Sequence, residues 1–123
     1  MKLTENFTLE EFGCADGTPV PKSLHGNVTL LAMNLQELRD ELGEAVHINS
    51  AYRTPTHNKK VGGKPNSEHL KATAADITTR SKTPKQLASF IEKLIASGKM
   101  KQGGLGIYPS FVHYDVRGRK ARW

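Results

Sequence analysis

Three potential metal ligands lie far apart in this sequence, and a fold that uses them together must bring the chain back on itself. His69 and Asp76 are seven residues apart, and His113 follows Asp76 after thirty-seven more. Two imidazoles and a carboxylate form a plausible zinc site, because catalytic zinc takes three protein ligands and leaves a fourth position for water. Chance triplets of this kind are common, since the chain has five histidines and twelve acidic residues. The surrounding segments must therefore decide whether the three residues meet.

The segment around Asp76 predicts a short buried strand, Ala74–Thr78. Asp76 is the one charged residue in this run of small and apolar side chains. A buried carboxylate without a partner costs on the order of several kcal/mol. A metal ion or one of the eighteen basic residues would supply that partner, and the sequence leaves both alternatives open.

Two further short strands, Leu105–Ile107 and Phe111–Val116, predict a hairpin around a Tyr-Pro-Ser turn. Side chains alternate along a strand, so His113 and Asp115 share one face and point the same way. A short sheet that pairs this hairpin with the strand around Asp76 would bring the potential ligands together. Metal sites are commonly built on rigid elements of this kind.

Caps and apolar spacing predict two main helices. The first runs from Asn27 to Leu42 and stops at Gly43. The second begins with Thr83 as N-cap, has proline at its first helical position and glutamine at its third, and continues to Gly98. The smaller predicted elements are a helical turn opened by a capping box at Thr8 and Glu11, and a strand at Val46–Asn49. We expect one α+β domain over residues 1–123, with a small antiparallel sheet that carries the site and packs against the two helices.

The stretch from Ser50 to Ser67 contains two prolines and two glycines and predicts turns and loop. Such a stretch is too long for an idle connection in a compact domain, so we interpret it as a binding loop.

Charge and cysteine content limit the possible functions. A formal net charge of +6 favours contact with polyanions, which include nucleic acid, acidic membrane surfaces and anionic cell-wall polymers. Cys14 is the only cysteine, so no intrachain disulfide can form. Residues 1–6 lack the apolar run of a signal peptide, and no segment is apolar enough to span a bilayer. We therefore expect synthesis in the cytoplasm and, for any role outside it, another route of delivery.

Five ordered blocks of residues resemble the M15 family of zinc peptidases, which includes D-alanyl-D-alanine carboxypeptidases and phage murein endopeptidases. The resemblance is to the short M15A-type domain, and it covers the chain from about Ile48 to Trp123. The blocks are Ile48-Asn49-Ser50-Ala51-Tyr52-Arg53-Thr54-Pro55, then Asn58 with Gly62-Gly63, then Ser67-x-His69 with Ala74-x-Asp76-Ile77, then Gly104-x-Gly106-x-Tyr108 with Phe111-Val112-His113-x-Asp115, and a closing Arg122-Trp123. The resemblance implies the fold shared by hedgehog and D-Ala-D-Ala peptidase domains.

The resemblance also implies roles for single residues. His69, Asp76 and His113 match the zinc ligands of the family. Arg53 matches an arginine that faces the carboxylate or carbonyl of the substrate, and its guanidinium suits that role because it binds a carboxylate through two parallel hydrogen bonds. A loop-bracing ion pair is the alternative for Arg53. Ser67 matches a serine at the metal site that binds substrate, although a turn or cap hydroxyl is nearly as good an interpretation.

The catalytic base is where this sequence departs from better-described members of the family. Many of them carry an acid three residues before the last zinc histidine or a histidine two before it, and those positions here are Ser110 and Phe111. We predict that Asp115 acts as the base or orients it, because its carboxylate shares the face of His113. Glu68 is the weaker candidate, since a residue next to His69 in an extended segment would point away.

The sequence thus predicts a Zn²⁺-dependent peptidase that cuts an amide bond in the peptide stem or crosslink of peptidoglycan. A phage or prophage endolysin, released through a holin, is the expected setting, with D-Ala-D-Ala carboxypeptidase and a silent zinc-containing wall-binding module as alternatives. We expect a monomer, no membrane insertion and no nucleic-acid partner. The basic pI and the basic tail, residues 117–123, favour a nucleic-acid-binding domain instead, although a solvated terminus or a strand end packed by Trp123 is the better interpretation of the tail.

Overall fold

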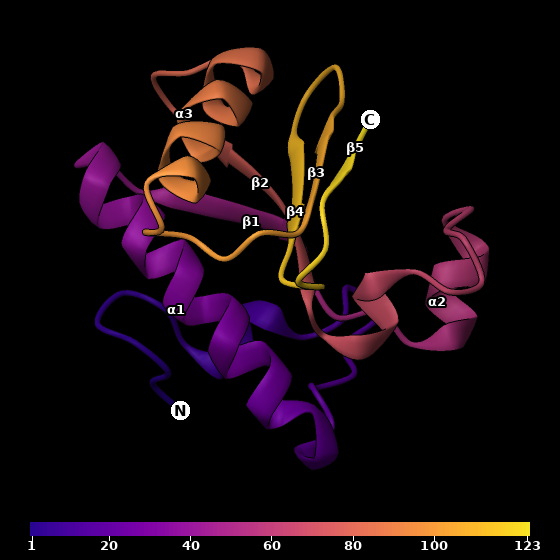
Figure 1. Ribbon diagram of the computed structural model, residues 1–123. Coiled ribbons are helices and arrows are strands. Elements are labelled where there is room, and N and C mark those ends of the chain that lie inside the picture. Colours follow the sequence, from indigo (N-terminus) through magenta and orange to yellow (C-terminus); the bar gives the residue numbers. More distant parts are fainter.

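The computed structural model describes all 123 residues, and its centre is a five-stranded sheet in the order β1-β2-β4-β3-β5 (Figure 1). The strands are β1 (Val46–Ser50), β2 (Ala74–Thr79), β3 (Gly104–Ile107), β4 (Val112–Asp115) and β5 (Ala121–Arg122). Neighbouring strands are antiparallel except β3 and β5, which are parallel. The predicted α+β class is confirmed, and the sheet differs from the prediction only in that its last strand makes it mixed.

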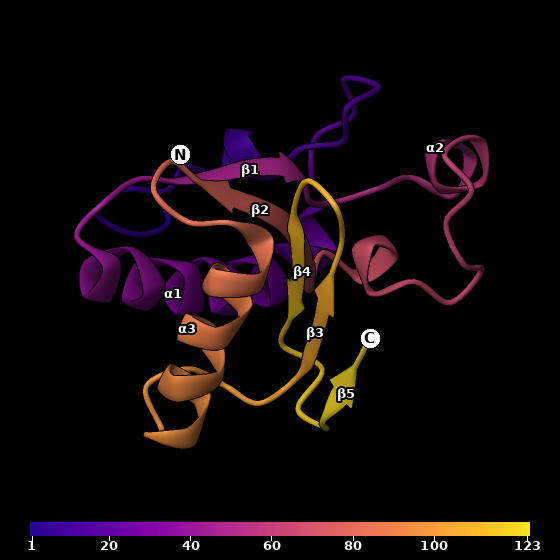
Figure 2. The ribbon, with the colours of Figure 1, turned by 90° about the horizontal axis from the view of Figure 1, so that it is seen from above.

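Two long helices, α1 (His25–Leu42) and α3 (Pro84–Ala96), lie on the same side of the sheet (Figure 2). Both begin and end near the predicted positions because the caps are local. Gly43 closes α1 in the left-handed conformation with φ of 70°. Thr83 accepts a hydrogen bond from the backbone N–H of Gln86, and the Gln86 side chain accepts one from the backbone N–H of Thr83.

The core lies between these helices and the sheet. Each element contributes the apolar face that its spacing predicts, and these side chains are almost completely removed from water. The largest of them are Leu31, Leu35 and Leu38 from α1, Leu87 and Ile91 from α3, and Ile77, Val112 and Tyr114 from the sheet. The two helices do not cover the part of the sheet near residues 55–71, and this part can carry a site (Figures 1 and 2).

The turn-rich segment is more ordered than the sequence indicates, because it contains a short helix, α2 (Pro55–Lys60). Thr54 caps this helix by accepting a hydrogen bond from the backbone N–H of His57, and Pro55 occupies its first position. Six residues are too few to show a helical period, which is why only loop was predicted. The 3-10 turn η3 (Glu68–Lys71) follows, and it lies with α2 beyond the end of the sheet (Figures 1 and 2).

The N-terminal capping box is present as predicted. It opens the 3-10 turn η1 (Leu9–Phe12), where the Glu11 carboxylate accepts hydrogen bonds from the backbone N–H and the hydroxyl of Thr8. A second 3-10 turn, η2 (Lys22–Leu24), leads into α1. None of the helices combines the length and the apolar character that a membrane crossing requires.

Candidate metal centre

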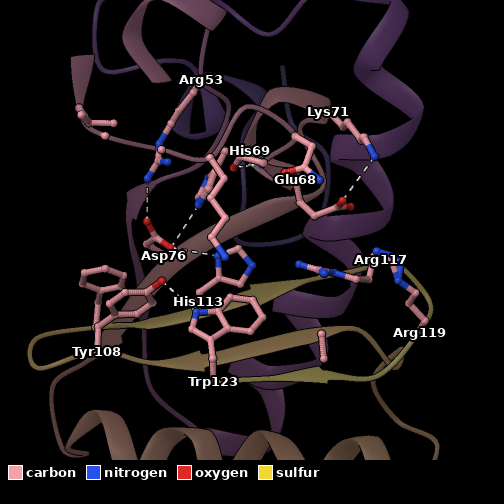
Figure 3. A pocket seen from close by; sticks show the side chains of 18 residues that line it. Arg53, Glu68, His69, Lys71, Asp76, Tyr108, His113, Arg117, Arg119 and Trp123 are labelled. Carbon is pink, nitrogen blue, oxygen red and sulfur yellow. Dashed lines mark hydrogen bonds and ion pairs between the residues drawn. The ribbon is translucent and has the colours of Figure 1, made fainter. Parts of the chain in front are cut away.

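The register of the sheet brings the three predicted ligands together. β2 and β4 pair so that Asp76 lies opposite His113, and η3 delivers His69 just before β2 (Figure 3). Asp76 Oδ1 lies 3.3 Å from His69 Nε2 and 3.5 Å from His113 Nδ1. All three side chains are buried, and their ligand atoms lie within 4.8 Å of one another. The geometry that the spacing suggested is therefore present.

The outer nitrogen of each ring is held by the protein. His69 Nδ1 lies 2.6 Å from the carbonyl oxygen of Ala51, and His113 Nε2 lies 2.7 Å from Asp115 Oδ2. Because a carbonyl or a carboxylate can only accept, each outer nitrogen carries the hydrogen and donates it. The inner nitrogens of the neutral rings then present lone pairs to the centre.

This arrangement fits a metal ion. Two imidazole lone pairs and a carboxylate oxygen face one another in a buried space. All three are hydrogen-bond acceptors unless one ring gains a second proton and becomes a donor. A cation placed there satisfies all three atoms at once. Two nitrogens and one carboxylate oxygen form a donor set that zinc takes in catalytic sites.

Arg53 occupies the other side of Asp76. Its Nη2 donates to Asp76 Oδ2 over 3.2 Å, while its Nε and Nη1 donate to Ser50 Oγ and Asn58 Oδ1, each over 3.3 Å. The partner expected for the buried aspartate is thus an arginine as well as the two imidazoles. Burial by itself raises the pKa of Asp76, but hydrogen bonds with His113 and His69 outweigh it and hold the pKa at about 2.

Asp115 does not lie where a base is needed. Its fully buried carboxylate sits beyond the far nitrogen of the His113 ring, away from Asp76. Its two oxygens also accept hydrogen bonds from the Arg117 guanidinium and from the backbone N–H of Gly104. Of the two roles predicted for Asp115, this position fits the orienting one, because the carboxylate bonds the outer nitrogen of His113 and does not line the cavity.

The pKa of Asp115 is consistent with a permanently ionised group. Burial by itself raises it, but hydrogen bonds from His113, Arg117 and the backbone N–H of Gly104 bring it well below its ordinary range. The close backbone of Gly104 makes one of these bonds possible, because a Cβ there would lie 2.2 Å from Asp115 Oδ2.

Ser67 and Glu68 lie at the start of η3. Ser67 Oγ accepts a hydrogen bond from the backbone N–H of His69 over 3.1 Å, so its observed contact is that of a cap. Glu68 does not point away as the extended prediction assumed, because the 3-10 turn rotates its side chain into the wall of the cavity. Thr73 and Lys71 hold its carboxylate over 3.1 and 3.4 Å.

A cavity of about 750 Å³ opens beside the three clustered side chains (Figure 3). Five basic residues line it: Arg53, Lys64, Lys71, Arg117 and Arg119. The acidic residues of its lining are Asp76 and Glu68. The cavity is therefore suited to a substrate that carries negative charge.

Aromatic side chains form one wall of this cavity. Trp123 Nε1 donates to Tyr108 Oη over 2.9 Å, Tyr108 stacks on Phe111 with ring centroids 4.5 Å apart, and the Trp123 ring lies 4.9 Å from the His113 ring. The short β5 puts Trp123 there, so the tail packs against the site. A strand end packed by Trp123 is one interpretation that the sequence offers for the tail, but the sequence does not indicate the contact of this ring with His113.

Gly106 provides the space for this tryptophan. A Cβ at that position would lie 2.4 Å from Trp123 Nε1, so Gly106→Ala must displace the ring. We expect a shift of the fluorescence emission toward longer wavelength, which is readily assigned because Trp123 is the sole tryptophan. Gly26→Ala is the matched control, since a Cβ there meets nothing within 4 Å. An unchanged spectrum in Gly106→Ala would contradict the packing.

The stability of the metal-free protein should depend on pH through this cluster. Burial by itself lowers the pKa of His113, but hydrogen bonds with Asp115 and Asp76 raise it above its ordinary 6.5. Its contribution is complete below pH 6.5 and is lost as the pH rises through the raised value. The contribution of Asp76 is present above its ordinary 3.8 and is lost as the pH falls toward about 2.

We therefore expect the cluster to stabilise the metal-free fold most between pH 3.8 and 6.5. Thermal unfolding of the chelated protein from pH 3 to 9, compared with that of His113→Gln, measures this dependence. The same pH profile in both proteins would show that His113 is not the group responsible.

An α+β fold with two buried histidines and an aspartate converging beside a cationic cavity is typical of a metal-dependent hydrolase. The family model described as Peptidase M15 matches the chain over residues 5–115. The chain therefore belongs to the M15 family of peptidases. A search of the curated proteins found no match.

Proposed function

We propose that this peptidase is zinc-dependent and hydrolyses an amide bond in the peptide stem or crosslink of peptidoglycan. The observation that carries the proposal is the set of three acceptor atoms on His69, Asp76 and His113 that face one another. The outer nitrogens of the two histidine rings already donate to Ala51 and Asp115. Zinc bound by these residues would supply Lewis acidity and lower the pKa of water.

Arg53 is the residue proposed to position the substrate. Its guanidinium lines the cavity beside Asp76, and contacts from Ser50 and Asn58 hold it in place. A guanidinium remains charged at every relevant pH and offers paired donors to a carboxylate or a carbonyl oxygen. Ser67, with its hydroxyl engaged as a cap, lies close enough in the lining to add a polar contact.

Within this proposal Glu68 is the proton acceptor. It is the acid of the cavity lining that does not belong to the candidate metal cluster, and Asp115 is turned away from the cavity. Thr73 fixes its carboxylate from one side, which leaves an oxygen only weakly engaged by the 3.4 Å contact with exposed Lys71.

Glu68→Gln should lower kcat by about 10²- to 10⁴-fold, the usual contribution of a general base, with bound metal unchanged. Glutamine retains an oxygen that can accept from Thr73, so the wall of the cavity is preserved. Glu41→Gln, which alters an acid paired with Lys99 away from the cavity, is the matched control. Wild-type kcat in Glu68→Gln would remove Glu68 from the mechanism.

The charge of the molecule supports a wall substrate. The cavity lining is predominantly basic, and the chain carries a net charge of +6, which favours contact with an anionic polymer. Peptidoglycan stems also carry free carboxylates that Arg53 and its basic neighbours could bind. We propose a phage or prophage lysis enzyme that is made in the cytoplasm and reaches the wall through a holin, and that acts as a monomer.

Digestion of purified peptidoglycan, followed by mass spectrometry of the soluble fragments, tests the proposal. Loss of turbidity and new fragment ends with zinc, abolished by a strong chelator and restored by added zinc, are expected. Release of terminal D-alanine alone would identify a carboxypeptidase instead. Binding to the wall without any new fragment would identify the silent module, and activity that survives chelation would overturn the zinc assignment.

A further inference from the structure

A second cluster of potential metal ligands lies outside the cavity. Cys14, Asp16 and His57 each offer one donor atom, and these three atoms lie within 4.8 Å of one another. Cys14 and Asp16 come from the turn after η1, and His57 comes from α2. None of the three lines the cavity, so the cluster is independent of the function proposed above.

The backbone around Cys14 forms a closed turn. The backbone N–H of Gly17 donates to the carbonyl of Cys14, and the N–H of Cys14 donates to the carbonyl of Thr18, over 2.9 and 2.8 Å. Gly17 has φ of 95°, which a side chain would strain. The relative position of the thiol and the carboxylate is thus fixed by the turn itself.

Asp16 joins this turn to α2. Its Oδ1 accepts from the backbone N–H of Thr18 over 2.9 Å, and its Oδ2 accepts from the hydroxyl of Thr54 over 3.0 Å. Thr54 is the N-cap of α2, which presents His57 three residues later. A carboxylate oxygen has two lone pairs, so accepting from Thr18 or Thr54 still allows each oxygen to bind a ligand.

The donor set suits a thiophilic divalent cation. Sulfur, imidazole nitrogen and carboxylate oxygen are the three donor types that zinc takes, whereas Mg²⁺ and Ca²⁺ prefer oxygen alone. With bond lengths of about 2.0–2.3 Å, the donors of a tetrahedral zinc site stand roughly 3.3–3.8 Å apart. The three donor atoms lie within 4.8 Å of one another, so side-chain displacements of about 1 Å would bring them to that spacing. Cys14 is buried while Asp16 is exposed, so the cluster lies at the edge of the core.

We propose that Cys14, Asp16 and His57 bind a second divalent metal ion of the zinc class. The thiol of Cys14 releases its proton to solvent as the sulfur–metal bond forms, and the metal undergoes no redox change. Binding links the turn of residues 14–18 to α2. Because the chain from Val61 to Lys64 that follows α2 lines the cavity, the second metal holds one wall of the cavity in place.

Titration of the reduced, chelated full chain with Co²⁺ tests this proposal without any activity measurement. Thiolate ligation gives a charge-transfer absorption in the near ultraviolet, which ligands without sulfur do not give. Since Cys14 is the only cysteine, the band reports this cluster alone. We expect two equivalents of bound Co²⁺ in the wild type, together with the band. His113→Ala should lose one equivalent and keep the band.

The variants are chosen to leave the core intact. Cys14 packs among apolar residues, so Asp16→Asn and His57→Gln test the cluster without removing packed atoms. Loss of an outer hydrogen-bond partner alone costs a metal site about 10- to 100-fold in affinity, so loss of a direct ligand should raise the half-saturating Co²⁺ concentration by about tenfold or more. His47→Gln, at an exposed position of β1, is the matched control and should leave the titration unchanged.

Three results would overturn the proposal. The first is the absence of the charge-transfer band at saturating Co²⁺. The second is a titration that both Asp16→Asn and His57→Gln leave unchanged, and the third is an equal loss of Co²⁺ affinity in His47→Gln. Each of these results is independent of peptidoglycan digestion, so failure here is distinguishable from failure of the proposed function.

Discussion

His113→Ala is expected to abolish peptide hydrolysis and to remove one equivalent of bound zinc. The substitution deletes one of the three donor atoms that converge between β2 and β4, and it leaves Asp76 and Asp115 without the ring that separates them. Two protein ligands are fewer than the three that catalytic zinc sites use. The expected loss of hydrolysis is therefore as large as for removal of either of the other two ligands, His69 or Asp76.

Metal content by elemental analysis and digestion of peptidoglycan measure the two effects. His113→Gln serves as a second variant, because its amide can still donate to Asp115 and so protects the fold. His47→Ala, an exposed histidine of β1, is the matched control and should retain both metal and activity. Retained zinc together with full hydrolysis in His113→Ala would exclude the site.

Asp115→Asn is expected to lower zinc affinity by about 10- to 100-fold and to leave kcat near the wild-type value once zinc is saturating. The carboxylate fixes the His113 ring from behind and does not reach the cavity, so its loss weakens a ligand and removes no reacting group. An asparagine also leaves Arg117 without its bidentate partner. Some loss of stability should accompany the change, because a broken buried ion pair costs up to about 3–5 kcal/mol.

Hydrolysis as a function of zinc concentration distinguishes the two roles that the sequence allowed. An orienting Asp115 gives a curve that shifts to higher zinc and reaches the same plateau. A base would give a curve with the same midpoint and a plateau lowered by about 10²-fold or more. Arg80→Gln, which alters an exposed arginine outside the cavity lining, is the matched control.

Local signals explain what could be predicted from the sequence. The capping boxes at Thr8 and Thr83 and the glycine stop after Leu42 are properties of a few neighbouring residues, and the structure shows all of them. Strand alternation also placed His113 and Asp115 on one face correctly, because it depends only on the backbone. The family resemblance is confirmed by the match over residues 5–115.

Features that depend on distant contacts could not be predicted. Whether Asp115 faces a water or a guanidinium depends on Arg117 and on the close backbone of Gly104. The aromatic wall requires β5 to pair with β3, and two residues are too few to predict a strand. Cys14 and His57 were assigned no role because their proximity comes from the docking of one turn against α2.

The pairing of Asp76 with His113 also has a consequence for folding. The two residues enclose a loop of thirty-six residues that contains α3 and β3, and a bound metal ion would close this loop as a disulfide does. The loop-closure relation for disulfides gives about 4 kcal/mol for a loop of this length. The single cysteine of this chain cannot form an intrachain disulfide. The metal ion proposed to complete the active site would therefore also stabilise the fold, because it would restrict the unfolded ensemble.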